Sequence, residues 1–314
     1  MKQTQAFLST YTADVSGVCS ALFELGGMTV MHDASGCNST YNTHDEPRWY
    51  DMDSLVYISG LSELEAVMGD DEKLISDVSD AARQLHPRFI ALAGTPIPMI
   101  TGCDLPAIAR EFAGRTNIPS FAVPSNGIGT YVAGAGQALR LYAEWFITSR
   151  PEKRKNAVNI LGATPLDFSV NGCVQSMARR LEEAGFTLQS VFAMSSSIDA
   201  IDKAGAAEAN LVISSVGLPA AKYLQAQFGT PYVIGAPFGD FFSPYVFDAL
   251  RESIRTGAPA DVLGTFAQDA PDTAIVGESV TAKSLAAALA VGYGIGARVI
   301  CPVEAPDGVL GACD

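Results

Sequence analysis

Short apolar runs alternate with stretches of helical periodicity along most of the chain. Residues 88–93 and 157–162 are mostly apolar, whereas residues 71–85 place apolar side chains three or four positions apart. Continuous apolar runs are typical of strands buried on both faces, and the wider spacing is typical of helices that cover a sheet. The pattern therefore predicts strand–helix–strand units and an α/β fold with parallel sheets.

The predicted elements follow one another in three series. Strands are expected at residues 27–32, 54–58, 88–93, 120–123, 157–162, 190–193, 209–214, 232–234, 273–277 and 298–300. Helices are expected at residues 71–85, 104–112, 134–147, 174–184, 197–203, 220–227, 245–256 and 279–291. In sheets of this kind, ligands bind beyond the carboxyl ends of the strands, so functional residues are expected in the loops that follow strands.

A charged segment at residues 149–156 interrupts the alternation and is typical of a linker between domains. The strand–helix pattern restarts after it, and again at residue 273. We therefore expect two Rossmann-like parallel-sheet domains plus an incomplete third, at residues 1–150, 151–271 and 272–314. A chain of 314 residues has the length for this division.

Composition narrows the possible partners. The chain has 34 acidic and 20 basic residues, a net charge of −14, which argues against nonspecific binding to nucleic acid or to an anionic membrane. With 48% hydrophobic and only 17% charged residues, disorder is excluded and a surface covered by a partner is expected. The first residues show no apolar run of a signal peptide, and no stretch is long enough to span a bilayer, so a cytoplasmic protein is expected.

The cysteines are the first candidates for chemistry. In a cytoplasmic chain they are free thiols rather than a disulfide framework, and three of them (Cys173, Cys301 and Cys313) are expected to be small buried hydrophobes. Cys37 follows a predicted strand at the mouth of a helix, where a thiolate is stabilised. Cys19 lies in an apolar helix before that strand. For both, a buried inert cysteine and a functional thiol remain open on this pattern alone.

Several other segments allow a functional and a structural interpretation. Two Gly-x-Gly pairs (127–129 and 134–136) are not followed by the lysine of a phosphate-binding loop and complete no dinucleotide fingerprint, so no nucleotide site is expected. Residues 44–51 are dense in functional groups and form either a substrate or partner surface or a solvated loop anchored by a tryptophan. The aromatic residues 238–245 face either a flat ligand such as a tetrapyrrole or the core.

The order of several segments resembles one protein family. Residues 17–37, with a small-residue helix, a strand and a His-x-x-x-Gly-Cys ending, resemble the cluster-binding segment of nitrogenase component 1 proteins. That family includes subunits of dark-operative protochlorophyllide reductase and of the reductive cyclase of nickel-tetrapyrrole synthesis. Further matches run collinearly through residues 60–74, 94–105, 159–236 and 276–278.

The resemblance implies a subunit that pairs, as a homodimer or with a paralogous subunit, around an iron–sulfur cluster of the [4Fe–4S] type. A separate ATP-dependent iron–sulfur reductase delivers the electrons in that family. Two copies of Cys37 and Cys19 would supply four thiolate ligands across a two-fold axis. A large subunit interface is then expected near Cys37.

The sequence also departs from the family. The third family cysteine aligns with Pro96, and Cys103 lies seven residues further on, either as a substitute ligand or in a helix-cap or buried role. Asp14 and Asp33 are conceivable oxygen ligands. The second-domain cysteine that holds the nitrogenase cofactor aligns with about Ser214. All three histidines lie in the first domain, so a molybdenum–iron type cofactor and dinitrogen reduction are not expected.

These observations leave three hypotheses. The first is the catalytic component of a nitrogenase-like oxidoreductase acting on an unknown substrate. The second is a non-catalytic scaffold or carrier for metallocofactor assembly. The third is a two-domain binding protein of the periplasmic type, against which the missing signal peptide counts.

Overall fold

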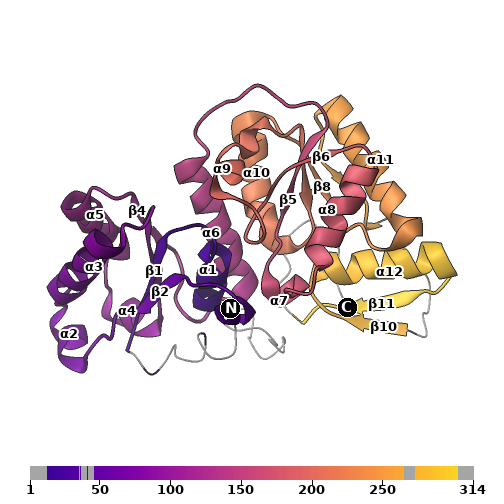
Figure 1. The fold of residues 1–314 in the computed structure, drawn as a ribbon. Helices are drawn as coiled ribbons and strands as arrows, with labels where there is room; N and C mark the ends of the chain where they lie inside the picture. Colours follow the sequence, from indigo (N-terminus) through magenta and orange to yellow (C-terminus); the bar gives the residue numbers. More distant parts are fainter. Residues whose placement is uncertain (1–12, 35, 37–40, 42–45, 265–272, 303–314) are drawn as a thin grey trace. The chain divides into compact units, whose positions relative to one another are not determined.

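The computed structural model describes residues 13–34, 36, 41, 46–264 and 273–302 (Figure 1). These residues divide into two compact units, Thr12–Ala138 and the chain from Leu139 onward, and the division falls inside helix α6 (Tyr131–Phe146). Within the named sheets, every described strand pair is parallel. The expected α/β fold with Rossmann-like parallel sheets is therefore confirmed.

The first unit is built on a four-stranded sheet in the order β2-β1-β3-β4. Its strands are β1 (Met28–His32), β2 (Leu55–Ile58), β3 (Ile90–Gly94) and β4 (Ser120–Val123). Its helices, besides the first part of α6, are α1 (Asp14–Leu22), α2 (Glu63–Met68), α3 (Glu72–Leu85), α4 (Pro96–Thr101) and α5 (Leu105–Thr116), and a 3-10 turn spans Pro47–Tyr50. The short helices α2 and α4 were not anticipated from the sequence.

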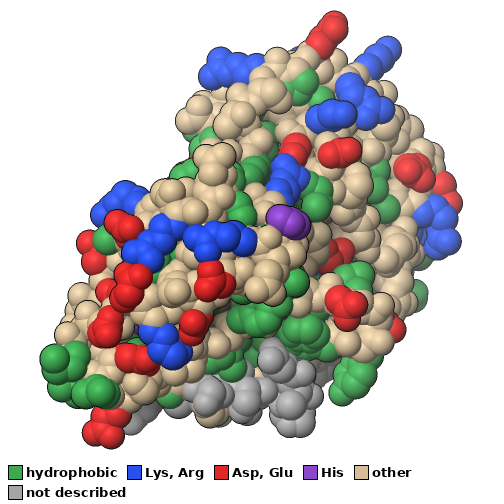
Figure 2. Space-filling view, turned by 60° about the vertical axis from the view of Figure 1, so that its left-hand side comes forward, with side chains coloured by type: hydrophobic (Ala, Val, Ile, Leu, Met, Phe, Trp, Pro, Cys, Tyr) green, Lys and Arg blue, Asp and Glu red, His purple; other side chains and the backbone are tan. Residues whose placement is uncertain are grey.

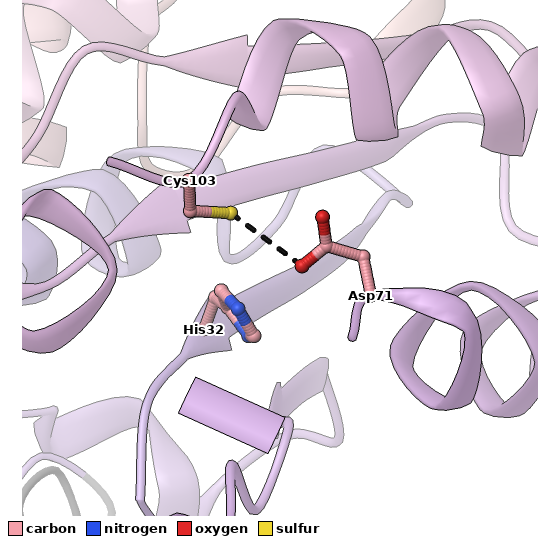
Figure 3. Close-up of side chains that lie close together, drawn as sticks. All are labelled: His32, Asp71 and Cys103. Carbon is pink, nitrogen blue, oxygen red and sulfur yellow. Dashed lines mark hydrogen bonds between the residues drawn. The ribbon is translucent and has the colours of Figure 1, made fainter. Parts of the chain in front are cut away.

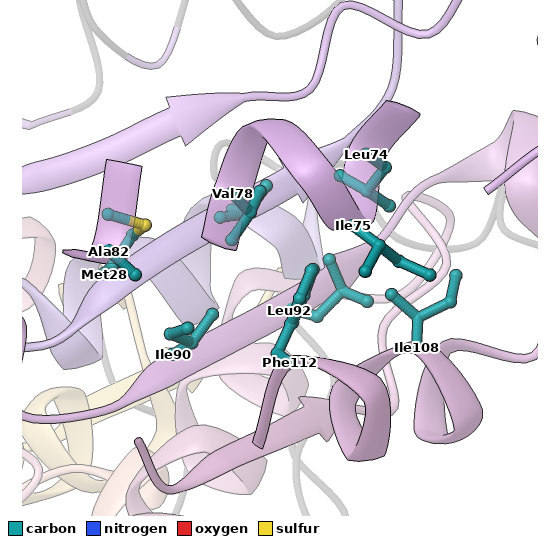
Figure 4. Packing of buried hydrophobic residues seen from close by; sticks show 10 residues of the cluster. Met28, Leu74, Ile75, Val78, Ala82, Ile90, Leu92, Ile108 and Phe112 are labelled. Carbon is teal, nitrogen blue, oxygen red and sulfur yellow. The ribbon is translucent and has the colours of Figure 1, made fainter. Parts of the chain in front are cut away.

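Apolar side chains from two helices fill one face of this sheet (Figure 4). Helix α3 contributes its periodic apolar residues up to Ala82, although the last of them, Leu85, is exposed. Helix α5 adds two more, over the central strands β1 and β3. The cluster consists of Met28, Val30, Leu74, Ile75, Val78, Ala82, Ile90, Leu92, Ile108 and Phe112. Burial of these side chains fixes the register of β1 against β3, which ends with His32 opposite Gly94.

The second unit has a five-stranded parallel sheet in the order β6-β5-β7-β8-β9. Its strands are β5 (Ala157–Leu161), β6 (Thr187–Val191), β7 (Ala209–Val212), β8 (Tyr232–Ile234) and β9 (Ala260–Asp261). Its helices are α7 (Pro165–Phe168), α8 (Cys173–Glu183), α9 (Ile198–Asp202), α10 (Leu218–Phe228) and α11 (Gly239–Thr256). Strand β10 (Thr273–Val276), helix α12 (Ser279–Tyr293) and strand β11 (Ala297–Ile300) follow as a separate β-α-β segment, and α12 packs on α11.

Two sequence-based boundaries differ from the structure for physical reasons. Strand β6 ends at Val191, because Ala193 and Ser195 adopt positive φ angles that a strand does not allow. Helix α11 begins before Pro244 rather than after it. Pro244 is the sixth residue of this helix and lies beyond the first turn, so its missing N–H removes one bond of the helical ladder, and the helix continues through it. The aromatic residues 238–245 are thus mostly helix, with Phe242 buried and Phe241 and Tyr245 exposed.

Glu278 joins the β-α-β segment to the five-stranded sheet. Its buried carboxylate accepts hydrogen bonds from the amides of Val280 and Thr281 (both 3.0 Å) at the start of α12. The other oxygen accepts from the amide of Ser215 (3.0 Å), in the loop after β7. One side chain therefore caps a helix and ties it to a loop 63 positions earlier.

Replacing Glu278 by alanine is expected to lower the free energy of unfolding by about 2–4 kcal/mol, because three backbone amides lose a charged acceptor. Urea denaturation of the full chain measures the change. Glu278→Gln keeps one acceptor oxygen and should lose less. Glu252→Ala, which removes an exposed partner of Arg255, serves as the control and should leave the stability close to that of wild type, because exposed ion pairs contribute little. An equal effect of the two alanine variants would contradict this role of Glu278.

Candidate functional site

The loops after β1, β3 and β4 are joined at the carboxyl edge of the first sheet. The Thr95 hydroxyl donates to the carbonyl of His32 (2.7 Å), and the Ser125 hydroxyl donates to the carbonyl of Gly94 (3.0 Å). Both hydroxyls are buried. These bonds hold the ends of β1 and β3 in fixed positions, at the edge where a parallel sheet places its ligands.

The carboxylate of Asp14 occupies the glycine-rich loop at residues 126–129. It accepts hydrogen bonds from the amides of Asn126 (2.9 Å) and Gly127 (2.8 Å), and also from that of Val15 (2.8 Å). Backbone amides of such a loop are the groups that would cradle a phosphate in a nucleotide-binding protein. Here the chain's own carboxylate fills the position. Both of its oxygens are engaged, which disfavours Asp14 as a metal ligand.

Cys19 lies in the middle of α1, with no part of its side chain exposed. Burial raises the pKa of its thiol well above the usual range, and the nearby carboxylate of Glu46 raises it further. The thiol is therefore protonated at neutral pH unless a metal displaces the proton. In the isolated subunit it has no exposed surface from which to reach a partner.

Glu46 and Arg48 form a buried ion pair beside α1. The guanidinium of Arg48 donates to Glu46 through Nε (2.6 Å) and to Glu24 through a terminal nitrogen (3.0 Å). Burial alone would lower the pKa of Arg48, but the hydrogen bonds and charges of Glu46 and Glu24 outweigh it and raise that pKa. Part of the segment 44–51, open between a solvated loop and a ligand surface on sequence grounds, is thus anchored in the core by its charged residues.

Three side chains with metal-ligand chemistry converge near the end of β1 (Figure 3). His32 is the last residue of β1, Asp71 directly precedes α3, and Cys103 lies between α4 and α5. One ligand atom from each lies within 4.8 Å of the other two. Sequence reasoning weighed Cys103 and noted His32 only as part of a motif. It missed Asp71, since an aspartate before a helix is usually read as a cap.

Burial shifts the pKa values of two of these side chains toward their neutral forms. Burial lowers the pKa of His32, although the nearby carboxylates of Asp71 and Asp33 oppose the shift. Burial also raises the pKa of Cys103 to about 12, with Asp71 adding to the effect. A neutral imidazole and a protonated thiol therefore face one carboxylate, and Sγ of Cys103 lies 3.8 Å from an oxygen of Asp71.

The remaining predicted residues are distributed as follows. Cys37 and Cys313 lie outside the described residues. Cys173 and Cys301 are partly exposed, so the expectation that they are buried is wrong; Cys173 begins α8 at the unit's surface. Pro96 is the first residue of α4, where its missing N–H is not needed. Ser214 is buried and donates its hydroxyl to the carbonyl of Gly162 (3.0 Å).

Comparison with known proteins places the chain in a family. A family model described as nitrogenase component 1 type oxidoreductase matches residues 16–261, which is more than half of the chain. The chain belongs to this family. The resemblance inferred from the collinear segments is therefore confirmed.

Three curated proteins illustrate the range of the family. The chain is 28% identical to the nitrogenase iron–molybdenum cofactor biosynthesis protein NifE of Methanosarcina barkeri over 196 residues, 58% of this chain and 42% of that protein. It is 27% identical to a light-independent protochlorophyllide reductase subunit of Nostoc punctiforme, over 54% and 36% of the two chains. It is 23% identical to the nitrogenase molybdenum–iron protein alpha chain of Clostridium pasteurianum, over 57% and 33%. The matches thus span less than half the length of these relatives.

A solved structure shares the fold. The structure described as Nitrogenase Cp1 at pH 5 has a TM-score of 0.70 to this chain at 17% identity, covering 98% of this chain and 67% of that one. Among the described residues, no helix combines the length and apolar character needed to cross a bilayer. On the face drawn in Figure 2, acidic and basic side chains are mixed, with hydrophobic groups between them.

Proposed function

We propose that the chain is a component of a nitrogenase-like oxidoreductase. In this proposal it accepts electrons from an ATP-dependent iron–sulfur reductase through an iron–sulfur cluster and passes them to a substrate other than dinitrogen. The observation that carries the proposal is the family match through residues 16–261. The fold supports it, because the loops after β1 and β3 meet at the edge where a cluster-binding segment is expected.

The cluster is proposed to be of the [4Fe–4S] type, shared between two subunits and held by Cys37, with Cys19 as the second ligand. Different observations bear on Cys37 and Cys19 as cluster ligands. Cys37 rests on the matching sequence segment and lies outside the described residues. The geometry of Cys19 counts against an interface position, since its side chain is wholly buried inside a single chain. The two are therefore tested separately.

A subunit partner is part of the proposal, either a second copy or a paralogous chain. Large apolar side chains are exposed on two short helices of the first unit, and exposed groups of this kind are typical of surfaces that bind another protein. They are Leu64, Val67 and Met68 of α2 and Ile100 of α4, each more than 70% exposed. A cytoplasmic location is proposed with it, because thiolate ligands and an iron–sulfur cluster require a reducing compartment.

Anaerobic purification followed by iron and sulfide analysis tests the cluster. Wild type should contain about two iron and two sulfide per chain, since one four-iron cluster is shared by two chains. Cys37→Ala should lose most of both. Cys173→Ala, which removes a thiol of the other unit, should keep them. Wild type without iron, or unchanged iron in Cys37→Ala, would exclude this cluster. Loss of iron in Cys19→Ala would add Cys19 to the ligands.

A second candidate function is a non-catalytic scaffold or carrier for metallocofactor assembly. It is favoured by one observation, the match to a cofactor biosynthesis protein over 58% of this chain. Both candidates predict a bound cluster, so metal analysis does not separate them. Electron transfer with the cognate reductase does: multiple turnovers of a reduced product support the oxidoreductase, and cluster transfer to an acceptor protein without turnover supports the scaffold.

A further inference from the structure

We propose that His32, Asp71 and Cys103 bind a single divalent cation of the zinc class. This site is separate from the cluster proposed above, and all three of its ligands lie in the described part of the first unit. An imidazole, a carboxylate and a thiolate together favour zinc and its relatives over magnesium or calcium, which prefer oxygen ligands alone.

The positions of the three ligands are fixed by different elements of the fold. His32 ends a central strand whose carbonyl is held by Thr95, and Asp71 directly precedes the long helix α3. Cys103 is held between α4 and α5, where its amide donates to the carbonyl of Pro98 (3.0 Å). The site therefore rests on packed elements at the carboxyl edge of the sheet, where α/β proteins bind ligands.

The distances suit a cation of this size. One ligand atom from each residue lies within 4.8 Å of the others. Around a tetrahedral zinc ion, bonds of about 2.0–2.3 Å place the ligand atoms about 3.3–3.8 Å apart. Asp71 and Cys103 are only half-buried, so we expect rotation of their side chains to close this gap when an ion binds.

Asp71 is not engaged in the role that its position suggests. It is the N-cap residue of α3, yet its side chain makes no capping hydrogen bond to that helix. Its one hydrogen-bonding neighbour among the described side chains is Sγ of Cys103, at the long distance of 3.8 Å. The neighbouring helix α5 shows the contrast, since Asp104 caps it through the amide of Ala107 (2.9 Å). The carboxylate of Asp71 is thus directed to the thiol and available to a cation.

Ser59 prepares His32 for metal binding. Its oxygen lies 2.9 Å from Nδ1 of His32, and its hydroxyl donates to the carbonyl of Asp33 (3.2 Å). If the Ser59 hydroxyl proton lies on that carbonyl, Nδ1–H of the imidazole donates to Ser59 and Nε2 carries the free lone pair. Metal-binding histidines are commonly oriented by such a bond from their second nitrogen.

A cavity adjoins one of the three ligands, Cys103. Cys103 lines a cavity of about 330 Å³ together with Thr95, Leu105 and Ser125, beyond the carboxyl ends of β3 and β4. With three protein ligands, one of which lines this cavity, the proposed site would be a zinc site with one open position, as opposed to a closed structural site. A water molecule or a small ligand of the cavity would complete the coordination.

Zinc binding by the full chain, purified anaerobically with its iron in place, tests the site. The protein is incubated with Zn²⁺, dialysed against a weak chelator and analysed for zinc, iron and sulfide. We expect about one retained zinc per chain, with zinc-edge X-ray absorption showing one sulfur at about 2.3 Å and nitrogen or oxygen at about 2.0–2.1 Å. Cys103→Ser should remove the sulfur contribution. Cys103→Ser, Asp71→Asn and His32→Gln should each weaken zinc retention at least tenfold.

The controls separate this site from others. Cys173→Ser removes another half-buried thiol. His86→Asn removes another histidine at a position with a left-handed backbone conformation, which asparagine also adopts readily. Both variants should retain zinc like wild type. Cys37→Ala should keep its zinc while losing iron. Circular dichroism shows whether each variant is folded, and Asp71→Asn is the decisive variant should His32→Gln fail to fold. The proposal is overturned if wild type retains no zinc, if Asp71→Asn and Cys103→Ser retain it unchanged, or if Cys103→Ser loses iron and sulfide.

Discussion

Replacing Arg48 by methionine is expected to lower the free energy of unfolding by about 3–5 kcal/mol. The guanidinium is 2% exposed, and it also donates to the backbone carbonyl of Ser20 (2.7 Å) and stacks over the ring of Phe23 at 4.6 Å. Methionine keeps much of the volume but leaves the carboxylate of Glu46 buried without its cation. An uncompensated buried charge is the main source of the loss.

The size of the effect should depend on that orphaned carboxylate. Arg48→Lys should recover only part of the stability, because an ammonium cannot reproduce the two bonds that the guanidinium makes to Glu46 (2.6 and 2.8 Å). The double variant Arg48→Met with Glu46→Leu should be more stable than Arg48→Met alone, since no buried charge remains. Guanidinium chloride denaturation of wild type, Arg48→Met, Glu46→Leu and the double variant completes the cycle.

A matched surface pair provides the control. Arg83 forms an ion pair with Asp80 on the exposed side of α3, so Arg83→Met should change the stability by less than about 0.5 kcal/mol. If Arg48→Met is as mild as Arg83→Met, the buried network does not anchor residues 46–48. The same network sets the surroundings of Cys19, because Glu46 is the charge that adds to the raised pKa of that thiol.

Most of the fold could be predicted because local patterns agree with the final packing. The periodicity of residues 71–85 anticipates α3, and its apolar positions up to Ala82 are buried against β1 and β3, whereas Leu85 at the end of the helix is exposed. The unanticipated helices lack such a pattern: α2 buries none of its residues, and α4 contains two prolines. Short helices of this kind depend on capping, as in the Ser62–Glu65 capping box, more than on an apolar face.

The candidate metal site could be predicted only in part. His32, Asp71 and Cys103 are far apart in the sequence and follow no known ligand spacing. They meet because parallel pairing ends β1 and β3 at one edge, and because α3 begins beside that edge. The sequence places Cys103 after a strand but does not tell which carboxylate faces it. That information lies in the packing of α3 against α5.

The glycines at 127–136 show the opposite case, in which a recognised pattern serves a different purpose. Gly-x-Gly pairs invite a phosphate-binding interpretation, which the missing lysine already argued against. In the structure the first pair surrounds the carboxylate of Asp14, where an added Cβ at Gly129 would lie 2.7 Å from a carboxylate oxygen. At Gly134 an added Cβ would lie 2.0 Å from the carbonyl oxygen of Asp14. These glycines therefore permit α6 and its preceding loop to approach α1 closely.

The second large effect is expected at Gly17, on the other side of that contact. A Cβ added there would lie 2.2 Å from the carbonyl oxygen of Tyr131 and 2.8 Å from the amide nitrogen of Ala135. Both are backbone atoms of α6, so no side-chain rotation can relieve the overlap. Gly17→Ala should therefore lower the free energy of unfolding by about 3 kcal/mol or more, by forcing α1 and α6 apart.

The direction of the change in unfolding free energy distinguishes Gly17→Ala from an ordinary glycine-to-alanine substitution in a helix. Alanine inside a helix is otherwise favoured over glycine by about 0.5–1 kcal/mol, because the unfolded glycine chain has more conformational freedom. Gly114, in α5, has no atom within 4 Å of an added Cβ, so Gly114→Ala should stabilise the protein by about 0.4–1 kcal/mol. Urea denaturation of both variants should move the midpoint in opposite directions. If Gly17→Ala instead stabilises the protein as Gly114→Ala does, α1 and α6 are not in backbone contact. The separation of α1 from α6 would also disturb Cys19, which follows Gly17 by two residues on the same buried helix. The iron content of Gly17→Ala would therefore report whether a cluster depends on that helix.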